Sequence, residues 1–265
     1  MSAPELERTG YRAALSLSCS DAVRGDLVAD GLVATAWRLG EDVRLTASRS
    51  RVSGLLGYGL LPGLGDYQRA HAAGGAELIW PADPAPQPWL VSVVDTQRRY
   101  LPMLLEVDVP VTAPVGVPLH SAVTRSPRSG WAVVRGEVHE RGTGAGLPWP
   151  VVTVTAAPQA YEVIGDELGR FLLIAPYPEA LPPLSGSPPA GPGLGAMTWS
   201  LTLAVRSEPA NLDRPSPGGT DPPELGSILG QADAQIDVAG VLRPSSTATL
   251  AFGSPTVLTL SVQPA

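Results

Sequence analysis

Three histidines and one cysteine are the residues of this 265-residue chain that could hold a transition metal or form a nucleophile and base pair. They are Cys19, His71, His120 and His139, and none of them stands at His-x-x-x-His or Cys-x-x-Cys spacing. No Gly-x-Ser-x-Gly turn presents a serine, and a phosphate-loop lysine is excluded because the chain contains no lysine. The sequence therefore predicts no catalytic, cofactor-binding or metal-binding residue, and no enzyme.

Acidic residues near the middle of the chain are the remaining candidates for an ion site. Asp166 and Glu167, together with Glu162, could supply the carboxylate oxygens that calcium prefers. The same residues also suit a tight turn in Gly165-Asp166-Glu167-Leu168-Gly169-Arg170-Phe171, because Asp bonds its own backbone and Gly accepts a positive φ. We expect Asp166 and Gly169 to shape such a turn, Phe171 to point into a core, and no metal to bind.

Aromatic residues beside prolines are the candidates for an interaction role. Trp80, Trp89 and Trp149 each adjoin a proline, and Tyr177 lies between two. Such a side chain either anchors a partner, since aromatic residues dominate interface hot spots, or covers the end of a β-sandwich. An alternative function, a carbohydrate- or ligand-binding module, would use Tyr67, Trp80 and Trp149 as a stacking platform.

The composition favours many short strands over long helices. Hydrophobic residues make up 44% of the chain, which is enough for a core, while 29 glycines and 29 prolines supply turns. Apolar and polar residues alternate at 11–19, which is the pattern of a half-buried strand, and further strands are expected at 131–140, 151–156, 170–175 and 256–262. The fold class expected is all-β, with two tandem antiparallel β-sandwiches joined by Pro- and Gly-rich loops.

Proline-rich segments mark the expected domain boundaries. A first β-sandwich covers 1–109, a Pro-rich linker covers 110–130, and a second β-sandwich covers 131–265. Two insertions, at 178–195 and 208–224, contain too few large apolar residues to pack a core, so we expect them to be exposed or held by a partner. The segment 225–230 is expected to lead back into the sheet.

Charge and cysteine content limit the partners and the compartment. The net charge is −7 and no basic run occurs, which argues against a nucleic-acid groove, because phosphate binding needs clustered cations. A single cysteine excludes an internal disulfide. With neither a basic start followed by an apolar stretch nor an apolar run of about 18 residues, we expect a cytoplasmic protein without a signal peptide or membrane span.

The second half of the chain resembles a known family. Gly136-Glu137-Val138, Thr143-Gly144, Leu147-Pro148, Val151 to Val154 and the turn ending at Phe171 are similar to the carboxypeptidase regulatory-like domain, a transthyretin-like sandwich. The match spans 131–179 and departs from the family pattern at Trp149-Pro150. The resemblance implies a transthyretin-like or Ig-like fold without an activity of its own.

A looser resemblance covers the whole chain. The layout, with Arg99-Tyr100-Leu101-Pro102 and Ala175-Pro176-Tyr177-Pro178-Glu179, is similar to β-rich proteins of contractile, phage-tail-like injection systems. The function expected is a non-enzymatic structural or assembly protein that docks to larger protein subunits, as a cap, baseplate or accessory component of such a particle. Homo-oligomers would fit this role, and no cofactor is expected.

Overall fold

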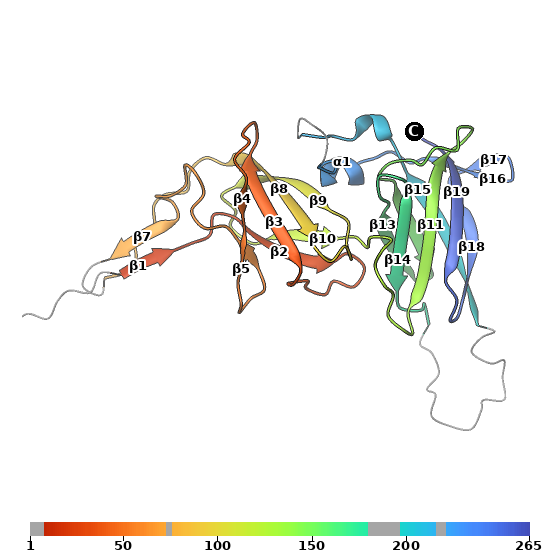
Figure 1. The fold of residues 1–265 in the computed structure, drawn as a ribbon, viewed down its shortest axis with the longest axis horizontal. Helices are drawn as coiled ribbons and strands as arrows, with labels where there is room; N and C mark the ends of the chain where they lie inside the picture. Colours follow the sequence, from red (N-terminus) through yellow and green to blue (C-terminus); the bar gives the residue numbers. More distant parts are fainter. Residues whose placement is uncertain (1–7, 73–75, 180–196, 216–220) are drawn as a thin grey trace, which may run out of the picture. The chain divides into compact units, whose positions relative to one another are not determined.

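The computed structural model describes residues 8–72, 76–179, 197–215 and 221–265 (Figure 1). Strands take up 48% of the protein and helices 3%, so the expected all-β class is confirmed. The chain divides into two compact units. Unit 1 contains Met1–Ser20, Leu27–Thr96 and Leu104–Pro118, and unit 2 contains Asp21–Asp26, Gln97–Met103 and Leu119–Ala265.

Unit 1 is built from two four-stranded sheets and a two-stranded ribbon. The first sheet has the order β10-β2-β6-β5, and the second has the order β4-β3-β8-β9. The strands of the sheets are β2 (Ser16–Asp21), β3 (Leu32–Arg38), β4 (Leu45–Thr46), β5 (Ser48–Arg49), β6 (Leu56–Gly57), β8 (Gln87–Asp95), β9 (Met103–Val109) and β10 (Val115–Leu119). The ribbon pairs β1 (Arg8–Tyr11) with β7 (Arg69–Ala72).

The alternation in β2 shows why unit 1 folds as layers. Leu17, Cys19 and Asp21 are buried, while the residues between them are only half-buried. One face of β2 therefore packs inward, as the period of two in a strand requires. The segment 110–130, which we expected to be a linker, contains β10, and β10 hydrogen-bonds to β2 at the edge of the first sheet.

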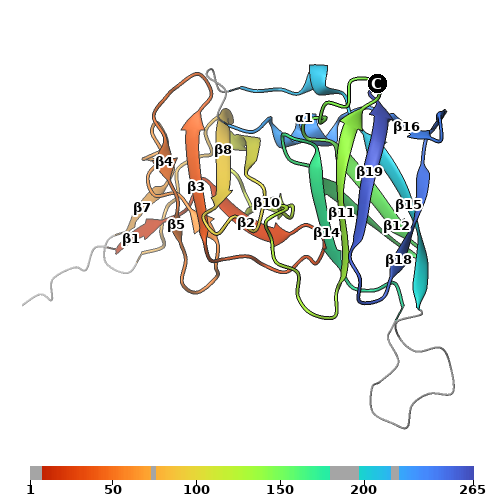
Figure 2. The ribbon, with the colours of Figure 1, turned by 45° about the vertical axis from the view of Figure 1, so that its right-hand side comes forward.

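Unit 2 is a β-sandwich of a five-stranded and a four-stranded sheet (Figure 2). The orders are β14-β11-β19-β16-β17 and β13-β12-β15-β18. The strands are β11 (Ala132–Glu140), β12 (Val151–Ala156), β13 (Gln159–Ile164), β14 (Arg170–Ala175), β15 (Thr198–Arg206), β16 (Gln235–Val238), β17 (Val241–Arg243), β18 (Ser246–Ala251) and β19 (Thr256–Gln263). The inner faces enclose one cluster of buried side chains, which includes Val138, Val154, Phe171, Leu203 and Val262.

One pairing in unit 2 departs from the antiparallel arrangement that we expected. β11 pairs with β14 in the antiparallel sense but with β19 in the parallel sense, from Val134 opposite Thr256 to Glu140 opposite Val262. The beginning of β11, the end of β14 and the beginning of β19 therefore meet at the same end of the sheet. This end carries the candidate site.

Two short helices complete the described part of unit 2. They are α1 (Leu225–Leu229) and the 3₁₀ turn η2 (Pro209–Asn211). The segment 225–230, which we expected to lead back into the sheet, forms the helical turn α1, and the chain rejoins the five-stranded sheet at β16. The Glu224 side chain caps this turn by accepting a hydrogen bond from the Ser227 backbone N–H. None of the described helices has the length and hydrophobicity needed to span a bilayer. The expected insertion at 178–195 lies almost wholly outside the described residues.

Candidate interaction groove

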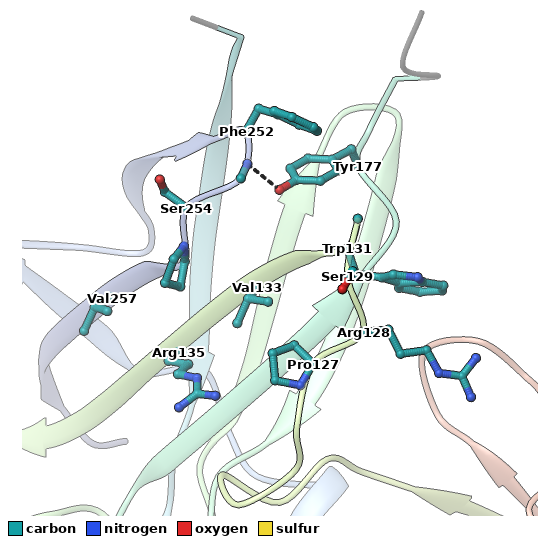
Figure 3. A pocket seen from close by; sticks show the side chains of 13 residues that line it. Pro127, Arg128, Ser129, Trp131, Val133, Arg135, Tyr177, Phe252, Ser254 and Val257 are labelled. Carbon is teal, nitrogen blue, oxygen red and sulfur yellow. Dashed lines mark hydrogen bonds between the residues drawn. The ribbon is translucent and has the colours of Figure 1, made fainter. Parts of the chain in front are cut away.

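A groove of about 550 Å³ lies at the end of unit 2 where β11 and β19 begin (Figure 3). We call it the β11–β19 groove. Its floor is the outer face of the five-stranded sheet, formed by Val133 and Arg135 of β11 and by Val257 of β19, which sits opposite Arg135. The segment 127–131 forms one wall, and the turn between β18 and β19 forms the other. The lining residues are Pro127, Arg128, Ser129, Gly130, Trp131, Val133, Arg135, Tyr177, Phe252, Gly253, Ser254, Pro255 and Val257.

Strand periodicity explains which residues of β11 reach the groove. Ala132, Val134 and Val138 point into the sandwich core, so Val133 and Arg135 point to the opposite face. Val133 is itself buried, because it packs with Leu172 and Ile174 of β14 under Val123 and Trp131. The outer face of this sheet is therefore apolar near β14 and is covered there by the chain that leads into β11.

Tyr177 holds the aromatic end of the groove together. Its hydroxyl accepts a hydrogen bond of 2.9 Å from the backbone N–H of Gly253 (Figure 3). Its ring centroid lies 5.0 Å from that of Trp199 and 5.0 Å from that of Phe252. These contacts tie the β18–β19 turn to the end of β14 and give the groove a fixed aromatic wall.

The groove is positively charged, although the protein as a whole is acidic. Arg128 and Arg135 line it, and none of the described residues along it is acidic. Neither arginine forms an ion pair or a side-chain hydrogen bond with any residue that the structure describes. Val257 is 74% exposed beside them. The groove thus combines an open apolar surface with two guanidinium groups that have no ion partner within the described ranges.

The hollow continues along the same sheet. A second depression of about 410 Å³ shares Arg135 and Val257 with the groove and runs on over Gly136, Phe171 and Leu258. It also includes Arg170, which pairs with Asp166, and Glu137. An occupant that follows both depressions would lie extended along β11 and β19.

Of the five residues proposed for interaction, Tyr177 lines this groove. Trp89 and Trp149 are buried, with exposed fractions of 1% and 5%, and Tyr67 is 8% exposed. Trp80 is 37% exposed. The rings of Trp89 and Trp149 fill the interior, so they present no surface to a partner in this structure.

Of the residues proposed as a sugar-stacking platform, Tyr67 and Trp149 are buried, with exposed fractions of 8% and 5%. Tyr67 and Trp80 belong to unit 1, whereas Trp149 belongs to unit 2. The guanidinium carbon of Arg12 lies 3.5 Å from the Tyr67 ring centroid and 5.1 Å from that of Trp80. Arg12 therefore occupies the aromatic faces that a sugar ring would need.

The turn before β14 has the geometry that its residue types favour. The Asp166 carboxylate accepts hydrogen bonds from the backbone N–H groups of Leu168 and Arg170, at 2.9 and 3.0 Å. Gly169 has a φ of +79°, and a Cβ there would lie 2.4 Å from the Val138 carbonyl oxygen. Phe171 is fully buried in the unit 2 core.

The acidic residues considered for calcium are each paired with an arginine. Asp166 pairs with Arg170, Glu167 with Arg214 and Glu162 with Arg206. Among the histidines, His71 belongs to unit 1, whereas His120 and His139 belong to unit 2. Across the described ranges, no three His, Cys, Asp or Glu side chains gather closely enough to hold a metal ion.

A buried polar cluster in unit 2 was not anticipated from the sequence. The Asp21 carboxylate accepts hydrogen bonds from the Tyr100 hydroxyl at 3.1 Å and from the backbone N–H groups of Val23 and Arg24, and it pairs with Arg125 at 2.7 Å. Burial raises the pKa of Asp21, but the hydrogen bond and the charge of Arg125, with the backbone donors, outweigh burial and lower it. Because four donors already occupy this carboxylate, the cluster is suited to hold loops together.

Apart from Tyr177, no local signal marks the groove residues. Sequence reasoning does not single out Arg128, Trp131, Arg135 or Val257 for interaction. Alternation places Arg135 on one face of its strand but does not say that β19 runs parallel beside it. Only that pairing brings Val257 and the β18–β19 turn next to 127–135.

Comparisons with known proteins give only distant likenesses. No family model and no curated protein matches the chain. The Bacillus anthracis TIE protein is 11% identical with a TM-score of 0.26, over 95% of this chain and 34% of that one. The shaft pilin SpaA from Lactobacillus rhamnosus GG is 9% identical with a TM-score of 0.25, over 98% and 99% of the two chains. BcpA, the major pilin subunit of Bacillus cereus, is 8% identical with a TM-score of 0.26, over 99% and 65%.

Proposed function

We propose that this protein is a non-enzymatic structural or assembly protein whose β11–β19 groove receives an extended, acidic segment of a partner subunit. One observation carries the proposal. Arg128 and Arg135 line an aromatic, proline-walled groove, no described acidic residue lines it with them, and neither has an ion partner among the described residues. An acidic segment would supply the missing charge, and its apolar residues would cover Val257.

The residue types in the groove are those on which binding energy usually concentrates. Trp, Tyr and Arg are enriched among interface hot spots, and the groove holds Trp131, Tyr177 and two arginines. A charge-assisted hydrogen bond contributes roughly 1.5–3 kcal/mol where water is excluded. An exposed ion pair contributes only about 0–1 kcal/mol, so the aromatic walls matter because they exclude water.

An extended occupant fits the shape of the floor. The groove and the depression that adjoins it follow two neighbouring strands, and an extended chain rises about 3.3 Å per residue, as the strands do. A segment of several residues would therefore keep contact along β11 and β19. We propose Tyr177 as an interaction residue, because its ring forms part of the aromatic wall.

The family assignment of the second half of the chain is part of this proposal. The Asp166 turn, the positive φ of Gly169 and the buried Phe171 support a carboxypeptidase regulatory-like module. A place in a contractile injection particle, as a cap, baseplate or accessory component, is the sharper form of the proposal. Its support is the resemblance of Arg99 to Pro102 and of Ala175 to Glu179.

Co-sedimentation with particles from the native host tests the proposal. Arg135→Glu reverses one groove charge, and Arg243→Glu makes the same change on the exposed edge strand β17 of the same sheet. We expect the wild-type protein and Arg243→Glu to co-sediment, and Arg135→Glu to lose at least about tenfold of its bound fraction, which corresponds to about 1.4 kcal/mol. If the wild-type protein stays in the supernatant, the particle role is wrong, and equal losses in both variants would rule out the groove.

A further inference from the structure

Another hollow of unit 2, which shares Arg128 and Trp131 with the groove, is dominated by arginine. It measures about 290 Å³ and is lined by ten residues, all of unit 2: Arg24, Gln97, Arg99, Tyr100, Thr124, Arg125, Ser126, Arg128, Trp131 and Ile174. We call it the arginine pocket. Four of the ten are arginines, whereas the whole chain of 265 residues contains 18 basic residues. Ten residues of average composition would include fewer than one basic residue.

Aromatic rings hold three of these guanidinium groups in place. The guanidinium carbon of Arg24 lies 4.9 Å from the Trp131 ring centroid. Those of Arg125 and Arg99 lie 4.5 and 5.6 Å from the Tyr100 ring centroid. Stacking against a ring engages the face of a guanidinium and fixes its orientation, so these three groups are ordered before any ligand arrives.

Ion pairs among the described residues offset only part of the positive charge of the pocket. Arg125 pairs with Asp21, and Arg24 pairs with Asp26. Arg128 has no ion pair with any described residue, and no described acidic residue lines the pocket. Hydroxyl groups of Thr124 and Ser126 add further polar atoms to its wall. Guanidinium forks of this kind match the oxygens of phosphate and related anions.

We propose that the arginine pocket binds a tetrahedral oxyanion of the phosphate class. A dianion forms more charge-assisted hydrogen bonds with several converging guanidinium groups than a single carboxylate does, because it offers more acceptor oxygens and twice the charge. The shared chemistry is a phosphoryl group, either as the free ion or as a phosphate ester. This site differs from the groove, which takes an extended segment and includes Arg135 but neither Arg24 nor Arg99.

Calorimetric titration of the full chain with inorganic phosphate, at constant ionic strength and pH 7.5, tests the proposal. We expect saturable binding by the wild-type protein. Arg128→Gln and Arg99→Gln should each weaken it by about tenfold or more, since each removes a guanidinium that faces the pocket. Arg135→Gln, in the groove only, and Arg243→Gln, on β17, should change it by less than about twofold. Arg125 is left intact because it pairs with buried Asp21.

Three further measurements make the result decisive. Far-UV circular dichroism should show that every variant keeps the wild-type strand signal. Phosphoserine titrated in place of phosphate distinguishes the source, since equal affinity assigns the pocket to phosphate esters and binding of phosphate alone assigns it to the free ion. Glutamate should bind at least about tenfold more weakly than phosphate. The proposal fails if phosphate shows no saturable binding, if Arg135→Gln and Arg128→Gln weaken it equally, or if glutamate binds as tightly.

Discussion

Adding a methyl group at Gly136 tests the packing of unit 2, and the expected cost in stability follows from interatomic distances. Gly136 faces Phe171 across the β11–β14 pair. A Cβ at Gly136 would lie 2.4 Å from Cζ and 2.5 Å from Cε1 of Phe171, and 3.0 Å from the Leu258 carbonyl oxygen on the other side. Carbon atoms in contact are normally about 3.5–4.0 Å apart, so the ring would have to move by more than about 1 Å.

Neither neighbour can yield easily. Phe171 has no exposed surface and lies within the core cluster, and the Leu258 oxygen belongs to the backbone of β19. Overpacking of a filled core costs about 1–3 kcal/mol, and this site should lie near the upper end, at about 3 kcal/mol for Gly136→Ala. Phe171→Leu removes the clashing atoms, so the double variant should be more stable than Gly136→Ala alone, with a coupling of about 2 kcal/mol.

Urea unfolding followed by hydrogen exchange of the 132–140 peptide reports unit 2 separately from unit 1. Gly116→Ala in β10 is the control, because a Cβ there has no atom within 4 Å, and it should change the unfolding free energy of its own unit by less than about 0.5 kcal/mol. A Gly136→Ala protein as stable as wild type, or a double variant no more stable than Gly136→Ala, would refute the packing of Phe171 against β11.

Two further predictions concern buried titratable groups. Burial lowers the pKa of His120 to about 4, against a smaller opposing effect of Asp21, so between about pH 6.5 and 4 the unfolded chain binds more protons than the folded protein. The unfolding free energy should fall by roughly 3 kcal/mol as the pH drops through this window. Urea titrations of His120→Gln should lack this contribution to the pH dependence of the unfolding free energy. The same pH dependence in His120→Gln and in the wild-type protein would contradict the prediction. Burial raises the pKa of Cys19 to about 11. Iodoacetamide at pH 8 should therefore label the native protein at least about 100-fold more slowly than the urea-unfolded protein. Equal labelling rates would show that Cys19 is exposed.

The all-β class could be predicted because strand patterns and turn residues depend on only a few neighbouring positions. The strands at 151–156 and 170–175 were predicted with the bounds that the structure has, since each alternates or runs apolar between turn signals. The turn at Asp166 depends on contacts within four residues. Features that depend on such short-range contacts can be predicted from the local sequence.

Those local patterns could not predict which distant strands pair. The parallel contact of β11 with β19 joins residues more than 100 positions apart, and alternation reads the same for parallel and antiparallel neighbours. Helix α1, with five residues, is too short to show a helical period. The groove and the arginine pocket both depend on such distant contacts, so neither could be predicted.

A neighbouring proline does not tell whether a tryptophan is exposed or buried. Trp149 lies between two prolines, has a φ of 54° and is buried, because its backbone N–H donates to the Asp166 carbonyl and its carbonyl accepts from Gln231. Of the two roles expected for Trp149, a partner anchor or a cover over the end of a β-sandwich, its 5% exposed fraction agrees with the second. Trp131 packs against the buried Val133 cluster and lines both the groove and the arginine pocket.

Photo-crosslinking from the groove in the native host tests the central claim most directly. A photoreactive phenylalanine analogue replaces Val257, which is 74% exposed in the groove, or Val241, which is 50% exposed on β17 as the matched control. We predict an adduct from position 257, mapped by mass spectrometry to one segment rich in Asp and Glu, that is absent from position 241 and lost when Arg135→Glu is added. Equal adducts from both positions, or a segment from position 257 that lacks acidic residues, would contradict the claim that this groove is the docking surface.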